Sequence, residues 1–244
     1  MSRGRPTVLA TSGGLRRGER RLYALSPLFL YGLELTGVSG RAPRVCALNT
    51  ALGDDRWVGA QLAEAAAEAG VEWYACNLFP MPPSADLAGY LGDADMIWVG
   101  GGSVANLLVL WRLHGLDAAL RSCWEEGIVC AGTSAGSICW HVGGTTDSFG
   151  PELAPVTDAL GFVPYANGVH HDSEARRRPL LHALVADATL PSAYATDDGV
   201  GLVYRGTDLA EVVGERPGAA AWQIVRRGDA VHEERLEPRL VAGA

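Results

Sequence analysis

The sequence predicts an α/β fold in which a doubly wound, mostly parallel sheet carries helices on both faces and the C-terminal part is rich in hairpins. Short apolar runs alternate with amphipathic stretches through the first half of the 244-residue chain, and closely spaced strand-like runs follow residue 192. Strand–helix alternation specifies a parallel sheet covered on both faces. The sequence contains no linker-like segment and no internal repeat, so we expect one α/β domain spanning residues 1–244.

The expected elements follow from the spacing of the apolar residues. Five apolar runs are expected to form the parallel strands: 7–10, 45–48, 71–76, 96–99 and 128–131. Four stretches with apolar residues every three or four positions, the period of one helix face, are expected as helices: 22–35, 57–69, 104–111 and 116–126. Four later runs, separated by turn residues, are expected as strands of the same sheet system: 192–196, 199–204, 210–213 and 220–226.

Composition and charge exclude several classes of partner. A formal net charge of −8 argues against nucleic acid, because binding to phosphates needs a dense basic surface, and the short basic clusters at 16–17, 20–21 and 176–178 are interpreted as solvated faces. The five cysteines are scattered, as in reduced proteins, and no apolar segment has the length of a membrane span. We therefore expect a cytoplasmic protein without a nucleic-acid or membrane partner, and we leave a homodimer open.

Glycine-rich turns follow three of the predicted strands, at residues 11–14, 100–103 and 132–136. Ligands of open α/β sheets bind at the carboxyl ends of strands. The third turn has the pattern Gly-x-Ser-x-Gly between a predicted strand and a helix. This is the nucleophile-elbow pattern, in which two glycines permit a strained turn that lifts the serine oxygen clear of the sheet. We interpret Ser134 as the nucleophile of a serine hydrolase, with a structural tight turn as the alternative.

The loop Gly100-Gly101-Gly102 offers free backbone N–H groups beside this elbow. It lacks the third glycine of a dinucleotide-binding loop, and no Gly-Lys-Ser/Thr of a P-loop occurs in the chain. We expect the Gly101 and Gly102 N–H groups to form half of an oxyanion hole, and the Ala135 N–H to form the other half. Close packing of helix against strand is the alternative role of these glycines.

A serine nucleophile needs a base, usually histidine, and a carboxylate that orients the base. His170 stands in the loop 167–172, and Asp198 follows the predicted strand 192–196. We favour the chain order Ser134, His170, Asp198. The α/β-hydrolase order of serine, acid and histidine would require His232 as the base, and that residue lies in a polar strand.

These segments together resemble peptidase E and its relatives, within the class I glutamine amidotransferase-like, flavodoxin-like fold. The resemblance rests on residues 99–103 followed by 106–108, on 132–136, on 164–170 and on 197–199. It implies that Ser134 attacks, that His170 serves as base and then as acid, and that Asp198 orients His170. The acid of the family prototype is a glutamate, so Asp197 stays open as an alternative to the shorter Asp198, and His171 as an alternate base.

Family members that cleave after an N-terminal aspartate use an arginine shortly after the histidine to bind the substrate carboxylate. Arg176 is the matching position here, although Glu174 could neutralise it within the protein. The resemblance therefore implies a serine-type exopeptidase or dipeptidase that hydrolyses small peptides through an acyl-enzyme on Ser134, with N-terminal Asp as a candidate specificity.

Other functions stay open. An α/β-hydrolase-type esterase would use His232 as its base. A non-catalytic ligand-binding relative would keep the fold without the hydrolytic activity. A metal hydrolase would use His170, His171 and Asp172, but their spacing is poor for zinc and no His-Glu-x-x-His occurs. We therefore expect neither a metal nor a cofactor.

Overall fold

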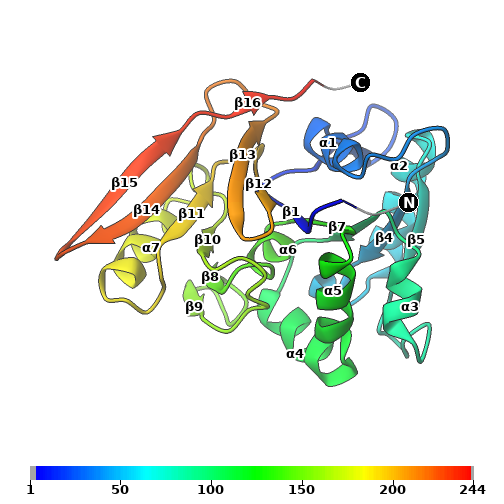
Figure 1. Ribbon diagram of the computed structural model, residues 1–244, viewed down its shortest axis with the longest axis horizontal. Coiled ribbons are helices and arrows are strands. Elements are labelled where there is room, and N and C mark those ends of the chain that lie inside the picture. The colour runs from blue at the N-terminus through cyan, green and yellow to red at the C-terminus, as the bar shows by residue number, and fades with distance from the viewer. Residues whose placement is uncertain (1–3, 243–244) are drawn as a thin grey trace.

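The computed structural model describes residues 4–242, and its largest element is an eight-stranded sheet (Figure 1). The order across the sheet is β16 (Arg239–Leu240), β13 (Asp208–Gly214), β12 (Val200–Arg205), β1 (Thr7–Thr11), β7 (Val129–Thr133), β6 (Met96–Val99), β4 (Arg44–Leu48) and β5 (Glu72–Ala75). Strands β1, β7, β6, β4 and β5 are joined by parallel pairing, whereas β12 pairs antiparallel with β1 and β13. The predicted α/β class with a mostly parallel sheet is confirmed.

Helices cover both faces of this sheet, because successive side chains of a strand point to opposite sides. On β6, Met96 and Trp98 pack into the cluster that contains α1 and α2, whereas Ile97 and Val99 pack into the cluster that contains α3, α4 and α5. The helices are α1 (Pro27–Leu35), the short η1 (Thr50–Leu52), α2 (Arg56–Glu68), α3 (Leu87–Gly92), α4 (Val104–His114), α5 (Leu116–Glu125), α6 (Ala135–Ile138) and α7 (Arg177–Ala186).

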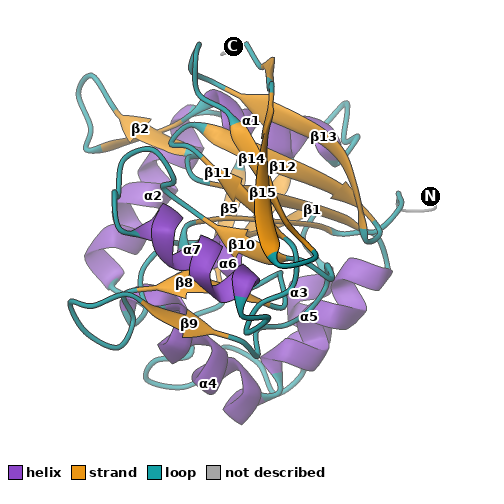
Figure 2. Cartoon of the chain, turned by 90° about the vertical axis from the view of Figure 1, so that its left-hand side faces the viewer, coloured by secondary structure: helices purple, strands orange, loops and turns teal. Residues whose placement is uncertain are grey.

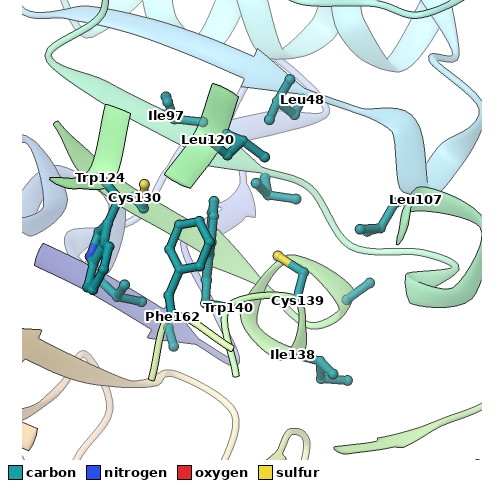
Figure 3. Close-up of a cluster of buried hydrophobic side chains, with 14 of the residues drawn as sticks. Leu48, Ile97, Leu107, Leu120, Trp124, Cys130, Ile138, Cys139, Trp140 and Phe162 are labelled. Atoms are coloured by element: carbon teal, nitrogen blue, oxygen red, sulfur yellow. The ribbon is translucent and has the colours of Figure 1, made fainter. Parts of the chain in front are cut away.

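A group of buried aromatic rings anchors the segment that follows β7 and α6 (Figure 3). The ring of Phe162 lies between those of Trp140 and Trp124, with centroid separations of 5.2 and 5.1 Å. Aromatic pairs at such distances add a stabilising contact to the burial of their area. The segment after α6 is thereby held against α5 and the main sheet, so the turn that precedes α6 has a rigid support.

A second sheet of six strands lies beside the first, with α7 packed against β8, β10, β14 and β15 (Figure 2). Its order is β15 (Ala230–Leu236), β14 (Ala221–Arg227), β11 (Ala193–Thr196), β10 (Ala166–Gly168), β8 (Gly143–Thr146) and β9 (Ala154–Val156). The expectation that the four C-terminal runs extend one sheet system is wrong in this respect: β12 and β13 join the main sheet, and β11 and β14 join the second. Strand patterns do not encode the pairing partner, which is set by tertiary contacts.

The predicted helix 22–35 is also wrong at its start, because the chain there forms a two-stranded hairpin of β2 (Leu15–Arg17) and β3 (Tyr23–Leu25) before α1 begins at Pro27. Proline disfavours helical backbone at the residue before it, here Ser26, and is itself well suited to the first helical turn. The short helix α3 was not predicted from the sequence; the Asp86 side chain caps it by accepting a hydrogen bond from the Gly89 N–H at 2.9 Å.

His141 lies completely buried just after α6, held between two partners. Its Nδ1 lies 2.9 Å from the Ser137 carbonyl oxygen and its Nε2 lies 3.2 Å from the Tyr204 hydroxyl. A neutral ring that donates from Nδ1 and accepts at Nε2 satisfies both contacts. Burial lowers the pKa of His141 from 6.5 to about 4, although the hydrogen bond to Ser137 acts in the opposite direction.

This buried histidine should make the fold sensitive to mild acid. Between the unfolded pKa of 6.5 and the folded pKa of about 4, unfolding takes up a proton, so the free energy of unfolding falls as the pH is lowered through this window. We expect His141→Gln to flatten this dependence by up to ~1.4 kcal/mol per pH unit. Urea unfolding at pH 7, 6 and 5 measures both slopes. His171, whose pKa is also lowered by burial, is present in both proteins and contributes to both slopes. Equal slopes for the wild type and His141→Gln would show that unfolding does not change the protonation of His141.

Candidate active site

Ser134 lies at the end of β7 in a backbone conformation that residues other than glycine rarely adopt, with φ 55° and ψ −114°. Its N–H donates to the Thr11 carbonyl oxygen at 3.1 Å, and its own carbonyl oxygen accepts from the Ser137 N–H at 2.9 Å. Strained residues of this kind persist where the surroundings fix them, often at functional sites. The turn is therefore tied to β1 on one side and to α6 on the other.

The two glycines of the elbow pattern are required by close backbone contacts. A Cβ atom on Gly136 would lie 2.2 Å from the Val99 carbonyl oxygen, and one on Gly132 would lie 2.3 Å from the Gly136 carbonyl oxygen. Real side chains do not approach backbone atoms so closely. The Gly-x-Ser-x-Gly spacing thus lets the elbow pack closely against the carboxyl end of β6, while Ser134 projects from the carboxyl end of the sheet.

His170 and Asp198 meet Ser134 from the second sheet. The His170 Nε2 lies 3.1 Å from the Ser134 Oγ, and the His170 Nδ1 lies 2.6 Å from the Asp198 Oδ1. His170 follows β10 and Asp198 follows β11, and these two strands are parallel neighbours. Their carboxyl ends therefore lie side by side, and the structure brings all three predicted residues into one hydrogen-bonded series.

The alternative acid, Asp197, faces away from His170. Its Oδ2 accepts from the Ala220 N–H and its Oδ1 accepts from the Trp222 Nε1–H, both at 2.9 Å. With both carboxylate oxygens engaged by β14 and the segment before it, Asp197 ties β11 to β14. Asp198, and not Asp197, contacts the His170 ring.

The alternative bases lie elsewhere in the second sheet and its loops. The His171 Nε2 lies 2.9 Å from the Glu233 Oε1, which also lies 3.1 Å from the Nε2 of His182. Burial lowers the pKa of His171, and the contact with Glu233 only partly opposes this shift. His232 lies on β15, paired with Val225 of β14. The structure places neither His171 nor His232 against Ser134.

Two of the predicted oxyanion groups, Gly101 and Ala135, lie next to the serine, and Gly102 follows Gly101 in the same loop. A Cβ atom built on Gly101 would lie 3.3 Å from the Ser134 Cβ, so this backbone passes directly beside the elbow. Gly102 has φ +127°, and a Cβ there would lie 2.4 Å from the Ala51 carbonyl oxygen. Ala135 is the first residue of α6, so its N–H has no partner within the helix. These positions are compatible with donors aimed at a developing oxyanion.

Arg176 is placed at a different hollow. Its Nη1 lies 2.9 Å from the Glu152 Oε2 and its Nη2 donates to the Pro151 carbonyl oxygen at 2.8 Å. It lines a cavity with residues of the β8–β9 loop, and none of these residues lines the cavity beside His170. The anticipated neutralisation by Glu174 does not occur, because Glu174 pairs with Arg177 instead.

Three further residues hold the base and the acid in place, and sequence reasoning missed their roles. The Ser12 Oγ accepts from the His170 N–H at 3.1 Å, where His170 has φ 55°. The Asp172 Oδ1 accepts from the Asp198 N–H at 2.8 Å, and Arg216 bonds both to the Asp172 Oδ2 and to the Asp198 carbonyl oxygen. Ser12 stands in a strand-end turn that could have indicated it, whereas nothing in the sequence indicates Arg216.

The ionisation of Asp172 reflects this arrangement. Burial acts to raise its pKa, but the Asp198 N–H and the Arg216 guanidinium outweigh burial and lower the pKa below the ordinary value. Asp172 is therefore charged at neutral pH. A charged Asp172 between Arg216 and the backbone of Asp198 joins the loop that carries the base to the loop that carries the acid.

A protein-family model described as peptidase family S51 matches residues 8–212. The chain belongs to peptidase family S51. The S51 match spans Ser134, His170 and Asp198, and membership in this family makes the chain a peptidase. The resemblance to peptidase E found in the sequence is confirmed.

Relatives of this S51 chain agree with the match. A Bacillus subtilis (strain 168) protein named "Uncharacterized peptidase YgaJ" is 41% identical over 75% of this chain and 78% of its own length. A Shewanella denitrificans protein named "Peptidase E" is 31% identical over 52% of this chain and 57% of its own length. The crystal structure of a peptidase from an acI-B1 Actinobacterium has a TM-score of 0.68 at 18% identity, covering 97% of this chain and 96% of that one. At that identity, the structure shows that the fold is shared.

Across residues 4–242, no helix is long and apolar enough to cross a membrane. Over the same residues, no group of three or more His, Cys, Asp or Glu side chains could hold a metal ion.

Proposed function

We propose that the chain is a serine-type exopeptidase that cleaves small peptides through an acyl-enzyme on Ser134. The observation that carries this proposal is the hydrogen-bonded series from the Ser134 Oγ through the His170 ring to the Asp198 carboxylate, with separations of 3.1 and 2.6 Å. Nucleophile, base and orienting acid within such reach of one another are the mark of an activated serine. Family membership supports the cleavage of peptides.

In the proposed first half-reaction, the Asp198 carboxylate accepts a hydrogen bond from the His170 Nδ1–H, which leaves the lone pair of Nε2 directed at Ser134. Nε2 takes the hydroxyl proton as Oγ attacks the carbonyl carbon of the scissile bond. The negative charge that forms on the carbonyl oxygen is stabilised by backbone N–H groups of Gly101, Gly102 and Ala135. Nε2–H then donates its proton to the leaving amine, the carbon–nitrogen bond breaks, and Ser134 carries the acyl group as an ester.

In the second half-reaction, a water molecule takes the place of the leaving amine. His170 Nε2 removes a proton from this water as its oxygen attacks the ester, and then returns the proton to Oγ. The free acid leaves and Ser134 regains its hydroxyl. Throughout the cycle the Asp198 carboxylate accepts the hydrogen bond from Nδ1–H and stabilises the imidazolium whenever it forms.

The identity of the base can be tested by comparing two histidine variants. We expect His170→Ala to lower kcat/KM toward a cleaved dipeptide by about 10⁴-fold or more, because the base and its orienting contact are both lost. His232→Ala, in a strand of the second sheet that does not contact Ser134, should stay within about twofold, as expected for a residue remote from the site. Steady-state assays on a panel of dipeptides with N-terminal Asp, Asn, Glu and neutral residues measure both. The reverse pattern would favour an esterase of the α/β-hydrolase type.

A preference for N-terminal Asp is the finer part of the proposal, and it depends on Arg176. The Arg176 side chain is 64% exposed and paired with Glu152, so it must exchange this partner for a substrate carboxylate. Exposed ion pairs are weak, and the exchange is therefore inexpensive. The same dipeptide panel, applied to Arg176→Met, shows whether selectivity for Asp depends on this residue.

We also propose a cytoplasmic location. All five cysteines are buried, and none of them forms a disulfide within the described residues. Proteins of oxidising compartments use their cysteines in disulfides, whereas reduced buried cysteines are usual in the cytosol.

A further inference from the structure

The cavity that adjoins His170 has a volume of about 440 Å³ and is open at the surface. It is lined by Ser12, Gly13, Leu15, Thr133, His170, Asp198, Gly199, Glu215 and Arg216. Binding sites for small molecules are commonly of this size. Neither the Gly101 and Gly102 loop nor Arg176 contributes to its lining, so the cavity lies on the side of the base and away from the proposed oxyanion donors.

The position beside His170 decides which part of a substrate this cavity would hold. In the proposed reaction, which this inference assumes, the His170 Nε2–H protonates the leaving amine. The leaving group must therefore lie against His170, while the carbonyl oxygen points toward Gly101. A peptide residue on the leaving side would extend from His170 into this cavity. When the substrate is a dipeptide, that residue ends in a free α-carboxylate.

Arg216 supplies a cation in the wall of the cavity. Its Nε and Nη2 donate to the Asp198 carbonyl oxygen at 3.2 and 3.1 Å, and Nη2 also bonds to Asp172. Within residues 4–242, Nη1 has no hydrogen-bond acceptor, and the side chain is 52% exposed. One edge of the guanidinium is thus anchored and the other edge is left to bind an anion. Anchoring reduces the rotamer freedom that an arginine loses when it binds a carboxylate.

The two acids of the cavity wall have hydrogen-bond partners other than the free edge of Arg216. The Glu215 Oε2 accepts from the Leu28 N–H at 3.1 Å, near the N-terminus of α1, where a negative charge is favoured. The Asp198 Oδ1 is bonded to His170. Both carboxylates therefore have partners of their own, and neither pairs with the free edge of Arg216.

The β2–β3 hairpin contributes Leu15 to the wall of the cavity. Arg17 lies on the same face of β2 as Leu15, because strand side chains alternate. Arg16, Arg20 and Arg21 line a separate cavity with Ala65 and Glu68 of α2, so the cation in the wall beside His170 is Arg216.

We propose that this cavity is the leaving-group subsite and that Arg216 binds the free α-carboxylate of the residue that leaves. The site then takes dipeptides ending in a free acid in preference to the same peptides ending in a neutral group. A guanidinium that binds the carboxylate from a half-exposed position gives a preference of about tenfold.

The test compares one dipeptide with its C-terminal amide. The readout is the ratio of kcat/KM for the acid to kcat/KM for the amide, because any effect of Arg216 on the position of Asp198 slows both substrates and cancels. We expect a ratio of about ten in the wild type, falling close to one in Arg216→Met and to an intermediate value in Arg216→Lys, which keeps the charge but loses the planar fork. Arg226→Met removes an exposed arginine from β14 and should leave the ratio unchanged.

The outcomes separate this inference from the proposed function. A wild-type ratio near one, or an unchanged ratio in Arg216→Met, overturns the subsite assignment while leaving the peptidase reaction in place. If the acid and the amide are both cleaved and Ser134→Ala cleaves them at the same rate, the proposed mechanism fails instead. Should circular dichroism show that both Arg216 variants are unfolded, the wild-type ratio decides: a ratio of about ten supports a carboxylate site for the leaving residue, and a ratio near one overturns it.

Discussion

Replacing Ser134 with alanine is expected to lower kcat/KM toward a cleaved dipeptide by about 10⁴- to 10⁶-fold, the range seen when the nucleophile of a serine hydrolase is removed. The Oγ that lies 3.1 Å from the His170 Nε2 is the atom that would carry the acyl group, and no other hydroxyl of the described chain bonds to that nitrogen. Labelling by a fluorophosphonate probe should disappear together with turnover. Both measurements use the folded variant, because the substitution removes one oxygen atom and keeps the backbone of the elbow.

Ser122→Ala provides the matched control for this experiment. Ser122 lies on α5, where its hydroxyl bonds to Glu126, and its loss should change neither turnover nor labelling. Unchanged hydrolysis by Ser134→Ala would show that another group attacks the peptide bond. Labelling that persists in Ser134→Ala would show that the probe reports a different nucleophile.

The second large effect is expected on stability. A methyl group on Gly136 would lie 2.2 Å from the carbonyl oxygen of Val99 and 2.7 Å from its carbonyl carbon. These are backbone atoms at the end of β6, inside the main sheet, so they cannot rotate away as a flexible side chain would. We expect Gly136→Ala to lower the free energy of unfolding by at least ~3 kcal/mol, the upper end of overpacking effects. Urea unfolding at pH 7 measures the difference.

Gly59→Ala is the control for the loss of a glycine as such. Gly59 lies within α2, and the nearest atom to a Cβ there is the Asn49 side-chain nitrogen at 3.9 Å, an ordinary contact. Alanine in a helix is more favourable than glycine by about 0.5–1 kcal/mol, so this variant should be as stable as the wild type or more so. Equal stability of Gly136→Ala and Gly59→Ala would mean that the elbow does not nest against β6 as described.

The nucleophile could be predicted from the sequence because its chemistry is local. The elbow needs two glycines at fixed positions around a serine, and the same backbone contacts that require Gly132 and Gly136 produce the pattern that predicts Ser134. His170 could be proposed because it stands in a polar loop, where catalytic residues often gather. The short strand β10, which places this loop beside Ser134, was not predicted.

The choice between Asp197 and Asp198 could not be made from the sequence. Asp197 is occupied by the Ala220 N–H and the Trp222 ring, more than twenty positions further along the chain. The identity of its partners depends on β11 pairing with β14, which the strand pattern did not reveal. Arg216 was missed for the same reason, since its contacts with Asp172 and Asp198 exist only after the two sheets have met.

Ser134, His170 and Asp198 come from two different sheets, and this affects when activity can appear during folding. Ser134 projects from the eight-stranded sheet, while His170 and Asp198 project from the six-stranded one. A partly folded chain in which only the first sheet has formed would hold a serine without its base, and it would be inert toward the peptides around it. In refolding from urea, hydrolysis should accordingly recover no earlier than the contact between the two sheets, which turnover measured alongside circular dichroism would show.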